Sequence, residues 1–203
     1  VSLTLVALGG MAAFGLPGTV RNDAVQAGRL GFYDSYADQR EGSSARAMLG
    51  LRYDREHAGA VTHALTYGGY RTLHLFENFT GYLADPVNGD FRDQRHEAYS
   101  FGAQVEHVQT LHPTIALRAG AGVRGDVLAQ KERSVDGNDD FVSLRRGLSG
   151  VQLSPFAFLG GIWEPIKAFR AEGGARLDLV HVAMKDEANG GPKERGTLAA
   201  ASP

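Results

Sequence analysis

Long segments of this chain alternate between apolar and polar residues with a period of two. In residues 114–126, TIALRAGAGVRGD, the odd positions from Ile115 to Val123 are apolar, whereas the even positions are mostly charged or small. The same alternation recurs in residues 43–54, 97–108 and 169–179. A period of two predicts β-strands that are apolar on one face and polar on the other, and helical periodicity is nearly absent.

The glycines of this segment also match the dinucleotide-binding pattern G-x-G-x-x-G, at Gly120, Gly122 and Gly125. That pattern has physical meaning only between a buried strand and a helix that meets a pyrophosphate. Here the strand carries Arg118 and Arg124 on its second face, and polar loop composition soon follows it. We therefore interpret Gly120 and Gly122 as residues that leave room for long neighbours on the polar face.

The connections between the patterned segments alternate in length. Tight turns are expected at DREHAG, TLHPT and EPIK, and long polar loops at DPVNGDFRDQRH, KERSVDGNDDFVSLRRG and KDEANGGPKERG. Transmembrane β-barrels have short turns at one rim, longer loops at the other, and strands of about ten residues. The fold class predicted is all-β, an antiparallel up-and-down transmembrane β-barrel that is incomplete, with roughly ten strands. A soluble β-sandwich is the alternative, because its strands also alternate.

Aromatic residues favour the membrane interpretation. Tyr53, Trp163 and Phe169 lie beside expected short turns, and Tyr67, Tyr99 and Phe101 are placed toward the opposite strand ends. Two aromatic girdles that flank a band of Ala, Leu and Val are typical of the two membrane–water interfaces.

Composition excludes several other classes. The 203 residues carry a formal net charge of −2 and no cysteine, so there is no basic footprint for nucleic acid, no disulfide framework and no thiol-ligated metal. The start, VSLTLVALGGMAAFGLPGTV, lacks a charged n-region and is interrupted by Gly and Pro, so we expect a strand there rather than a signal peptide. The two chain ends give the sequence the character of a segment of a longer polypeptide.

Residues 16–102 resemble the barrel of TonB-dependent outer-membrane receptors. The likeness is carried mainly by YGGYRTLHLFENFTGYLADPVNGDFRDQ, residues 67–94. In that family a strand ending in Tyr-Gly or a similar pair leads into Arg, then Asn-Phe-Thr-Gly, then Pro and Gly-Asp before the next strand. The closing GTLAAASP resembles a stretch that leads into a further strand. The resemblance implies that residues 1–203 are part of a single barrel domain, with the plug and both barrel ends outside the sequence.

The resemblance also implies a function. Such a receptor, in the bacterial outer membrane, binds and imports a ferric siderophore or a similar large, scarce nutrient, with energy from the TonB complex acting through the plug. Its partners would be outer-membrane lipid, TonB and the ligand, without nucleic acid, cofactor, metal or catalytic residue; it would not be an enzyme. Another outer-membrane barrel, either a porin or a barrel enzyme, and a soluble β-sandwich binding module are the alternatives.

Candidate ligand contacts are cations and aromatics expected near the long-loop end. Arginine suits anionic ligands and aromatic rings suit catechol groups. The candidates are Arg124, Arg176, Phe76, Phe79, Tyr82 and Phe91. The remaining charges of the polar face have two interpretations, as contacts to plug and ligand or as ionic ladders within the wall.

The sequence offers little support for other sites. The histidines are scattered without metal-ligand spacing, and the acidic loop that includes Asp85, Asn88, Asp90 and Asp93 does not have the EF-hand spacing. The Asn78-Phe79-Thr80 tripeptide fits the glycosylation pattern, but we interpret it as the end of a strand.

Overall fold

A computed structural model describes residues 1–16, 18–34, 41–87, 90–136 and 140–203. Almost all of the regular structure is strand, and the single helix within these ranges is short. The elements are β1 (Ser2–Gly15), α1 (Asn22–Gln26), β2 (Glu41–His57), β3 (Ala60–Asn78), β4 (Phe91–His112), β5 (Ile115–Val135), β6 (Phe141–Ile166), β7 (Phe169–Asp186) and β8 (Glu194–Ser202).

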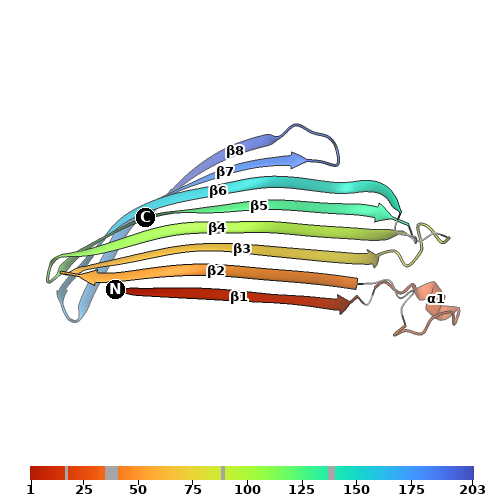
Figure 1. Cartoon of the computed structure of the whole chain (residues 1–203), viewed down its shortest axis with the longest axis horizontal. Helices are drawn as coiled ribbons and strands as arrows, with labels where there is room; N and C mark the ends of the chain where they lie inside the picture. The colour runs from red at the N-terminus through yellow and green to blue at the C-terminus, as the bar shows by residue number, and fades with distance from the viewer. Residues whose placement is uncertain (17, 35–40, 88–89, 137–139) are drawn as a thin grey trace.

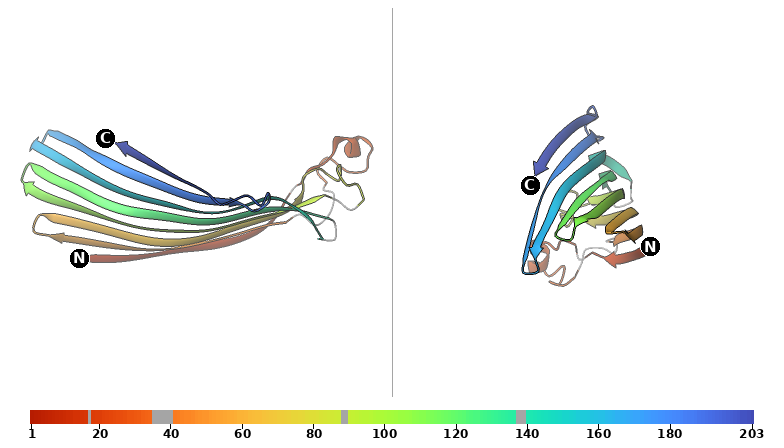
Figure 2. Two further views of the ribbon diagram at one scale, coloured as in Figure 1. Left: turned by 90° about the horizontal axis from the view of Figure 1, so that it is seen from above. Right: turned by 90° about the vertical axis from the view of Figure 1, so that its left-hand side faces the viewer.

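The strands form one antiparallel sheet in which every strand pairs with its neighbour in sequence, in the order β1 to β8. This order confirms the predicted all-β, antiparallel, up-and-down architecture. The described residues hold eight strands rather than roughly ten, and the sheet stays open, with β1 and β8 at its edges (Figure 1). Figure 2 shows that the sheet is strongly curved.

The strand count was overestimated because strands continue into segments that read as polar loops. The predicted loop KERSVDGNDDFVSLRRG is mostly strand, since β5 runs to Val135 and β6 begins at Phe141. The closing GTLAAASP belongs to β8 itself rather than to a lead into a strand. The first residues do form a strand, β1, as expected.

The two ends of the sheet differ as the connection lengths predict. The tight turns between β2 and β3, β4 and β5, and β6 and β7 lie at one end, and the longer connections and α1 lie at the other (Figure 1). The turn between β2 and β3 has positive φ at both central residues, 45° at Ala58 and 77° at Gly59. This conformation matches the twist of a two-residue hairpin, and Gly adopts it without strain.

The two faces of the sheet differ in the solvent exposure of their side chains. The apolar side chains at the alternating positions are exposed, at 55% for Leu49, 43% for Leu117 and 50% for Leu177. Polar-face residues between them, such as Gly122 and Ser154, are half-buried. Side chains on the inside of a curved sheet crowd one another, so this pattern indicates that the polar face is the inner one. No second sheet covers the apolar face within the described ranges, as a β-sandwich would require.

Cross-strand register defines two regions of the sheet. Tyr70, Tyr99, Val127 and Val151 form one row across β3 to β6 on the outer face. We call the part from this row to the short turns the wall, and the part on the loop side the rim. The outer face of the wall is mainly apolar, with polar residues such as His107 and His181 among the apolar ones, whereas the outer face of the rim carries Asp93, Arg95 and Lys131.

The outer face carries aromatics near both limits of the wall. Trp163 and Phe169 contact edge-to-face at 5.8 Å between ring centroids beside a short turn, and Tyr70 and Tyr99 lie 4.9 Å apart at the loop-side limit. Tyr67 was wrongly assigned to this girdle. Its register partners are Gly50 and Gly102, so it lies on the inner face, nearer the turn end of β3.

Pro155 sits at an irregular position of the β6–β7 ladder. The β6–β7 ladder pairs Leu153 with His181 and Phe156 with Asp178, and leaves Ser154 and Pro155 without partners on β7. Proline has no N–H to donate to a ladder, so this gap is the expected consequence. Within the described ranges no helix has the length and apolar character to cross a bilayer.

Candidate functional site

Most arginines on the inner face of the wall pair with a carboxylate two residues further along the same strand. Residues i and i+2 of a strand face the same way, so an Arg-x-Asp or Arg-x-Glu sequence places both charges on one face. The N···O distances are 2.9 Å for Arg52–Asp54, 2.8 Å for Arg124–Asp126 and 2.7 Å for Arg176–Asp178, and Arg170 pairs with Glu172 in the same way. The charge ladder of the wall is thus built mainly along strands.

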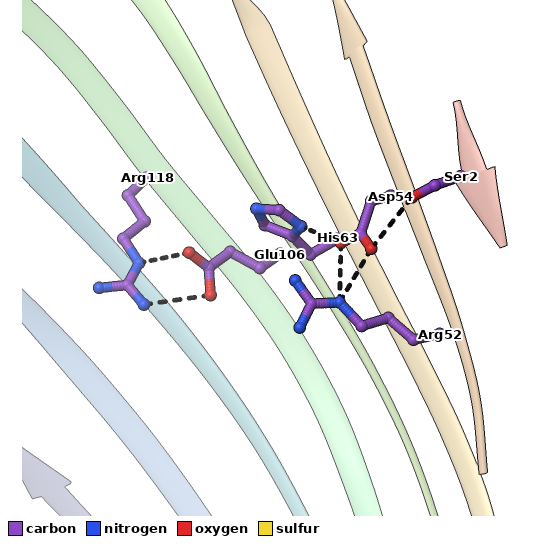
Figure 3. A network of polar contacts seen from close by, with 6 residues as sticks. All are labelled: Ser2, Arg52, Asp54, His63, Glu106 and Arg118. Atoms are coloured by element: carbon purple, nitrogen blue, oxygen red, sulfur yellow. Dashed lines mark hydrogen bonds and ion pairs between the residues drawn. The ribbon is translucent and has the colours of Figure 1, made fainter. Parts of the chain in front are cut away.

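Cross-strand contacts join some of these pairs near the turn end (Figure 3). Asp54 accepts hydrogen bonds from Arg52 and from Ser2 of β1, and the His63 ring nitrogen Nδ1 contacts the same carboxylate. On the next strands Arg118 reaches across to Glu106 through two hydrogen bonds of 2.7 and 3.1 Å. These inner-face charges are therefore satisfied by partners within the wall itself.

Gly120 and Gly122 make room for aromatic rings of β6. A Cβ added to Gly120 would lie 2.5 Å from the Phe158 ring, and one added to Gly122 would lie 2.6 Å from the Phe156 ring. Arg118 lies 5.3 Å from the centre of the Phe158 ring, within cation–π range. The prediction that these glycines leave space for long neighbours is confirmed, and their fingerprint spacing follows from the period of two.

The two predicted arginines lie on the inner face, but not at the rim. Arg124 and Arg176 are each paired with an aspartate, and Arg176 also lies 4.1 Å from the centre of the Phe156 ring. Arg176 is in the same cross-strand row as Glu106 and Gly120, nearer the turn end of β7 than its loop end. The expectation that it lies toward the long loops was therefore wrong, and its role as a ligand contact stays a prediction.

Three of the four predicted aromatics form one cluster at the loop end of β3 and β4. The rings of Phe76 and Phe91 are stacked at 5.2 Å, and Tyr82 meets Phe91 edge-to-face at 5.8 Å. Phe91 is 1% exposed, so its ring packs the base of the loop. Phe79 is 44% exposed, and its backbone carbonyl accepts a hydrogen bond from Thr19.

Asn78 explains the Asn-Phe-Thr-Gly motif. Its side chain is fully buried, and its Oδ1 accepts hydrogen bonds from the backbone N–H groups of Thr80, Gly81 and Tyr82. Its Nδ2 donates to Asp90 at 3.0 Å. Asn78 ends β3, as predicted, and its buried amide organises the loop rather than presenting a glycosylation site.

Asp93 is the centre of a charge cluster on the outer face of the rim. This carboxylate is 4% exposed and contacts His74, Arg95 and Arg133. Burial alone would raise the pKa of Asp93, but hydrogen bonds from Arg95 and Arg133 outweigh it and hold that pKa below its usual value. The cluster is therefore a buried, satisfied ion network.

A cavity of about 490 Å³ lies mainly on the inner face of the rim. Apolar side chains of Leu73, Leu75 and Leu148 line part of it. Polar and charged lining residues come from four strands and the β7–β8 connection: Gln94, Arg95, His96, Gln130, Lys131, Glu132, Arg145, Arg146, Asp186 and Asn189. Sequence analysis missed this site, because it placed Arg145 and Arg146 in a loop; the adjacent pair in SLRRG was the available signal.

The cavity is unbalanced in charge. Neither Arg145 nor Arg146 forms an ion pair with any residue of the described ranges. Arg92 lies 4.0 Å from the cavity residue Glu132, and burial together with the charge of Arg145 lowers the pKa of Arg92. The Asp186 carboxylate already accepts hydrogen bonds from the backbone N–H groups of Ala188 and Asn189. The arrangement can bind an anionic group and offers no evident nucleophile.

Metal sites are not apparent in the described parts of the chain, where no three His, Asp or Glu side chains gather in a group that could hold an ion. Several histidines contact a single partner, for example His107 with Thr62 and His181 with Thr197. In the acidic loop, Asp90 is bonded to Asn78 and Thr80, whereas Asn88 lies outside the described residues.

Comparison with known proteins supports the fold alone. No family model and no curated protein matches the chain. Among solved structures, the chain is similar to the ferric citrate transporter FecA in its unliganded form, with a TM-score of 0.65 and 12% identity. The match covers 98% of this chain and 30% of the transporter chain, so the described sheet corresponds in extent to part of a transporter barrel.

Proposed function

We propose that this chain is part of the barrel of a TonB-dependent receptor in the bacterial outer membrane. The receptor would import a ferric siderophore or a similar large anionic nutrient, with energy delivered through a plug domain. Two observations support this proposal: the exposed apolar outer face of a curved up-and-down sheet, and the structural similarity to FecA. On this proposal the barrel performs no chemistry on its ligand and uses no cofactor.

The proposal that the ligand is anionic rests on Arg145 and Arg146, the cations of the rim cavity that form no ion pair. Arginines of the wall are neutralised by carboxylates close by, as Arg52 is by Asp54. Arg145 and Arg146 form no ion pair within the described ranges, although Glu132 is the register partner of Arg146, and an anion would complete their hydrogen bonding. Their position at the loop end is where a ligand arriving from outside the cell meets the barrel.

The proposal is tested with the complete polypeptide in a bacterial strain that lacks other receptors. Uptake of radiolabelled iron supplied as ferric citrate or as an anionic catecholate chelate is compared with uptake of cobalamin, a nutrient with a different charge. We expect TonB-dependent uptake of an anionic chelate. The double variant Arg145→Gln/Arg146→Gln should reduce that uptake about tenfold or more, since each charged hydrogen bond contributes about 1.5–3 kcal/mol.

Arg52→Gln is the matched control, because it removes an inner-face arginine that is already paired in the wall. It should leave uptake close to wild type. Uptake that persists without TonB would indicate a passive channel instead. Wild-type uptake of every anionic chelate by the double variant would contradict the role of the rim cavity.

A further inference from the structure

A second hollow lies on the opposite, outer face of the sheet, at the boundary between wall and rim. Its volume is about 330 Å³. Its floor is apolar and includes Val127, Ala129 and Val151, while Lys185 and Lys193 line it on the side of β7 and the following connection. The hollow therefore combines an apolar floor with two ammonium groups.

The two lysines are available to a ligand. Both are exposed, and neither forms an ion pair with another described residue. The nearby carboxylate of Glu187 also interacts with Lys185, but it is already bound by Lys131 at 3.4 Å and by the Ser149 hydroxyl. On the other side Glu97 accepts a hydrogen bond from the Tyr99 hydroxyl.

Around the hollow, apolar residues and cations are separated in the same way as within it. On the wall side, the outer face continues with Phe101 and Leu153, which are 46% and 39% exposed. In the boundary row itself, Arg195 pairs in register with Ala183, the partner of Val151, and adds a third exposed cation. Apolar surface on one side and cations on the other match a lipid molecule with its chains along the wall and its headgroup at the lysines.

We infer that this hollow binds an anionic, phosphate-bearing lipid of the surrounding bilayer, with the phosphate held by Lys185 and Lys193. Cations next to a membrane surface attract anionic headgroups, and an apolar floor adds contact with the acyl chain. The inference rests on the membrane location proposed above, but not on the ligand or on energy coupling.

Native mass spectrometry of the complete barrel in detergent tests the inference. The probes are phosphatidylglycerol, phosphatidylcholine at the same concentration, and inorganic phosphate. We expect retained phosphatidylglycerol to exceed phosphatidylcholine. The double variant Lys185→Gln/Lys193→Gln should weaken phosphatidylglycerol binding by about thirtyfold, as expected for the loss of two lysine–headgroup contacts.

The control variant removes the same charge from the inner face of the sheet. Arg46 and Arg71 are register neighbours there, so Arg46→Gln/Arg71→Gln keeps the outer face intact and should bind phosphatidylglycerol as wild type does. Heat-modifiable gel mobility checks that both variants are folded. Equal losses in the two variants, no loss in the lysine variant, or full displacement of lipid by inorganic phosphate would overturn the inference. Because no transport is measured, a failure here is distinct from a failure of the uptake experiment.

Discussion

The wall and the rim of this sheet use arginine in different ways. In the wall, Arg52, Arg124 and Arg176 are held by carboxylates two residues away, and the charges are satisfied locally. At the rim, Arg95 and Arg133 share the buried Asp93, while Arg145 and Arg146 line a cavity without a carboxylate partner in the described residues. Local pairing gives the wall a polar but self-contained inner face, whereas unpaired charge at the rim is free to act on a ligand.

The largest expected effect tests what the outer face of the wall contacts. Ala121→Arg places a cation on that face midway between the start of β5 and the boundary row at Val127, and a cation at the bilayer midplane costs about 2–4 kcal/mol. Val142→Arg places the same residue at the rim, where Val142 is already 63% exposed, and should have little effect. The folded fraction after insertion into vesicles, measured by heat-modifiable mobility, distinguishes the two.

Arg118→Leu provides the comparison across the faces of the same strand. It removes a charge from the inner face and should impair insertion less than Ala121→Arg does. Similar losses for both substitutions would mean that the two faces are assigned incorrectly.

The next effect concerns the buried ion network of the rim. Asp93→Asn removes the charge that holds Arg95 and Arg133, and should destabilise the barrel by about 1–3 kcal/mol in urea unfolding. Glu172→Gln breaks the exposed Arg170–Glu172 pair in the wall, and should produce no measurable change. A larger effect at Glu172 than at Asp93 would reverse the distinction between wall and rim.

The same carboxylate gives a pH dependence with a defined sign. Because the pKa of Asp93 is lowered in the folded state, its stabilising contribution is complete above the unfolded value of about 3.9 and is lost as the pH falls through the folded value. Acid unfolding of the wild type should therefore include a component below about pH 4. Asp93→Asn should lack that component when unfolding is followed against pH.

The smallest expected effect concerns the inner packing of the wall. Gly120→Ala would place a Cβ 2.8 Å from the backbone oxygen of Val105, as well as against the Phe158 ring, and should cost about 1 kcal/mol. Gly68→Ala adds a methyl group to open space and should be neutral or slightly stabilising. Urea unfolding of both variants measures the difference, and equal stability would show that the ring moves aside without cost.

The local features of this protein follow from its amino-acid sequence. The period of two assigned Leu117 and Arg118 to opposite faces, and the connection lengths separated the turn end from the loop end. Both features depend on residues close together in the chain, because side-chain direction alternates along a strand and turn type depends on a few residues. Strand ends were harder to predict, since polar residues that suit a loop also suit a strand that continues beyond the apolar part of the sheet.

Contacts between residues far apart in the chain, in contrast, depend on how the strands pair in three dimensions. The rim cavity brings Leu73, Gln130 and Arg146 together from three strands, and the outer hollow brings Tyr99 near Lys193. Tyr67 joined the inner face because its register partners are Gly50 and Gly102, which its own neighbours in sequence do not reveal. Register is fixed by the pairing of whole strands, so sites that span several strands cannot be derived from the alternation within one of them.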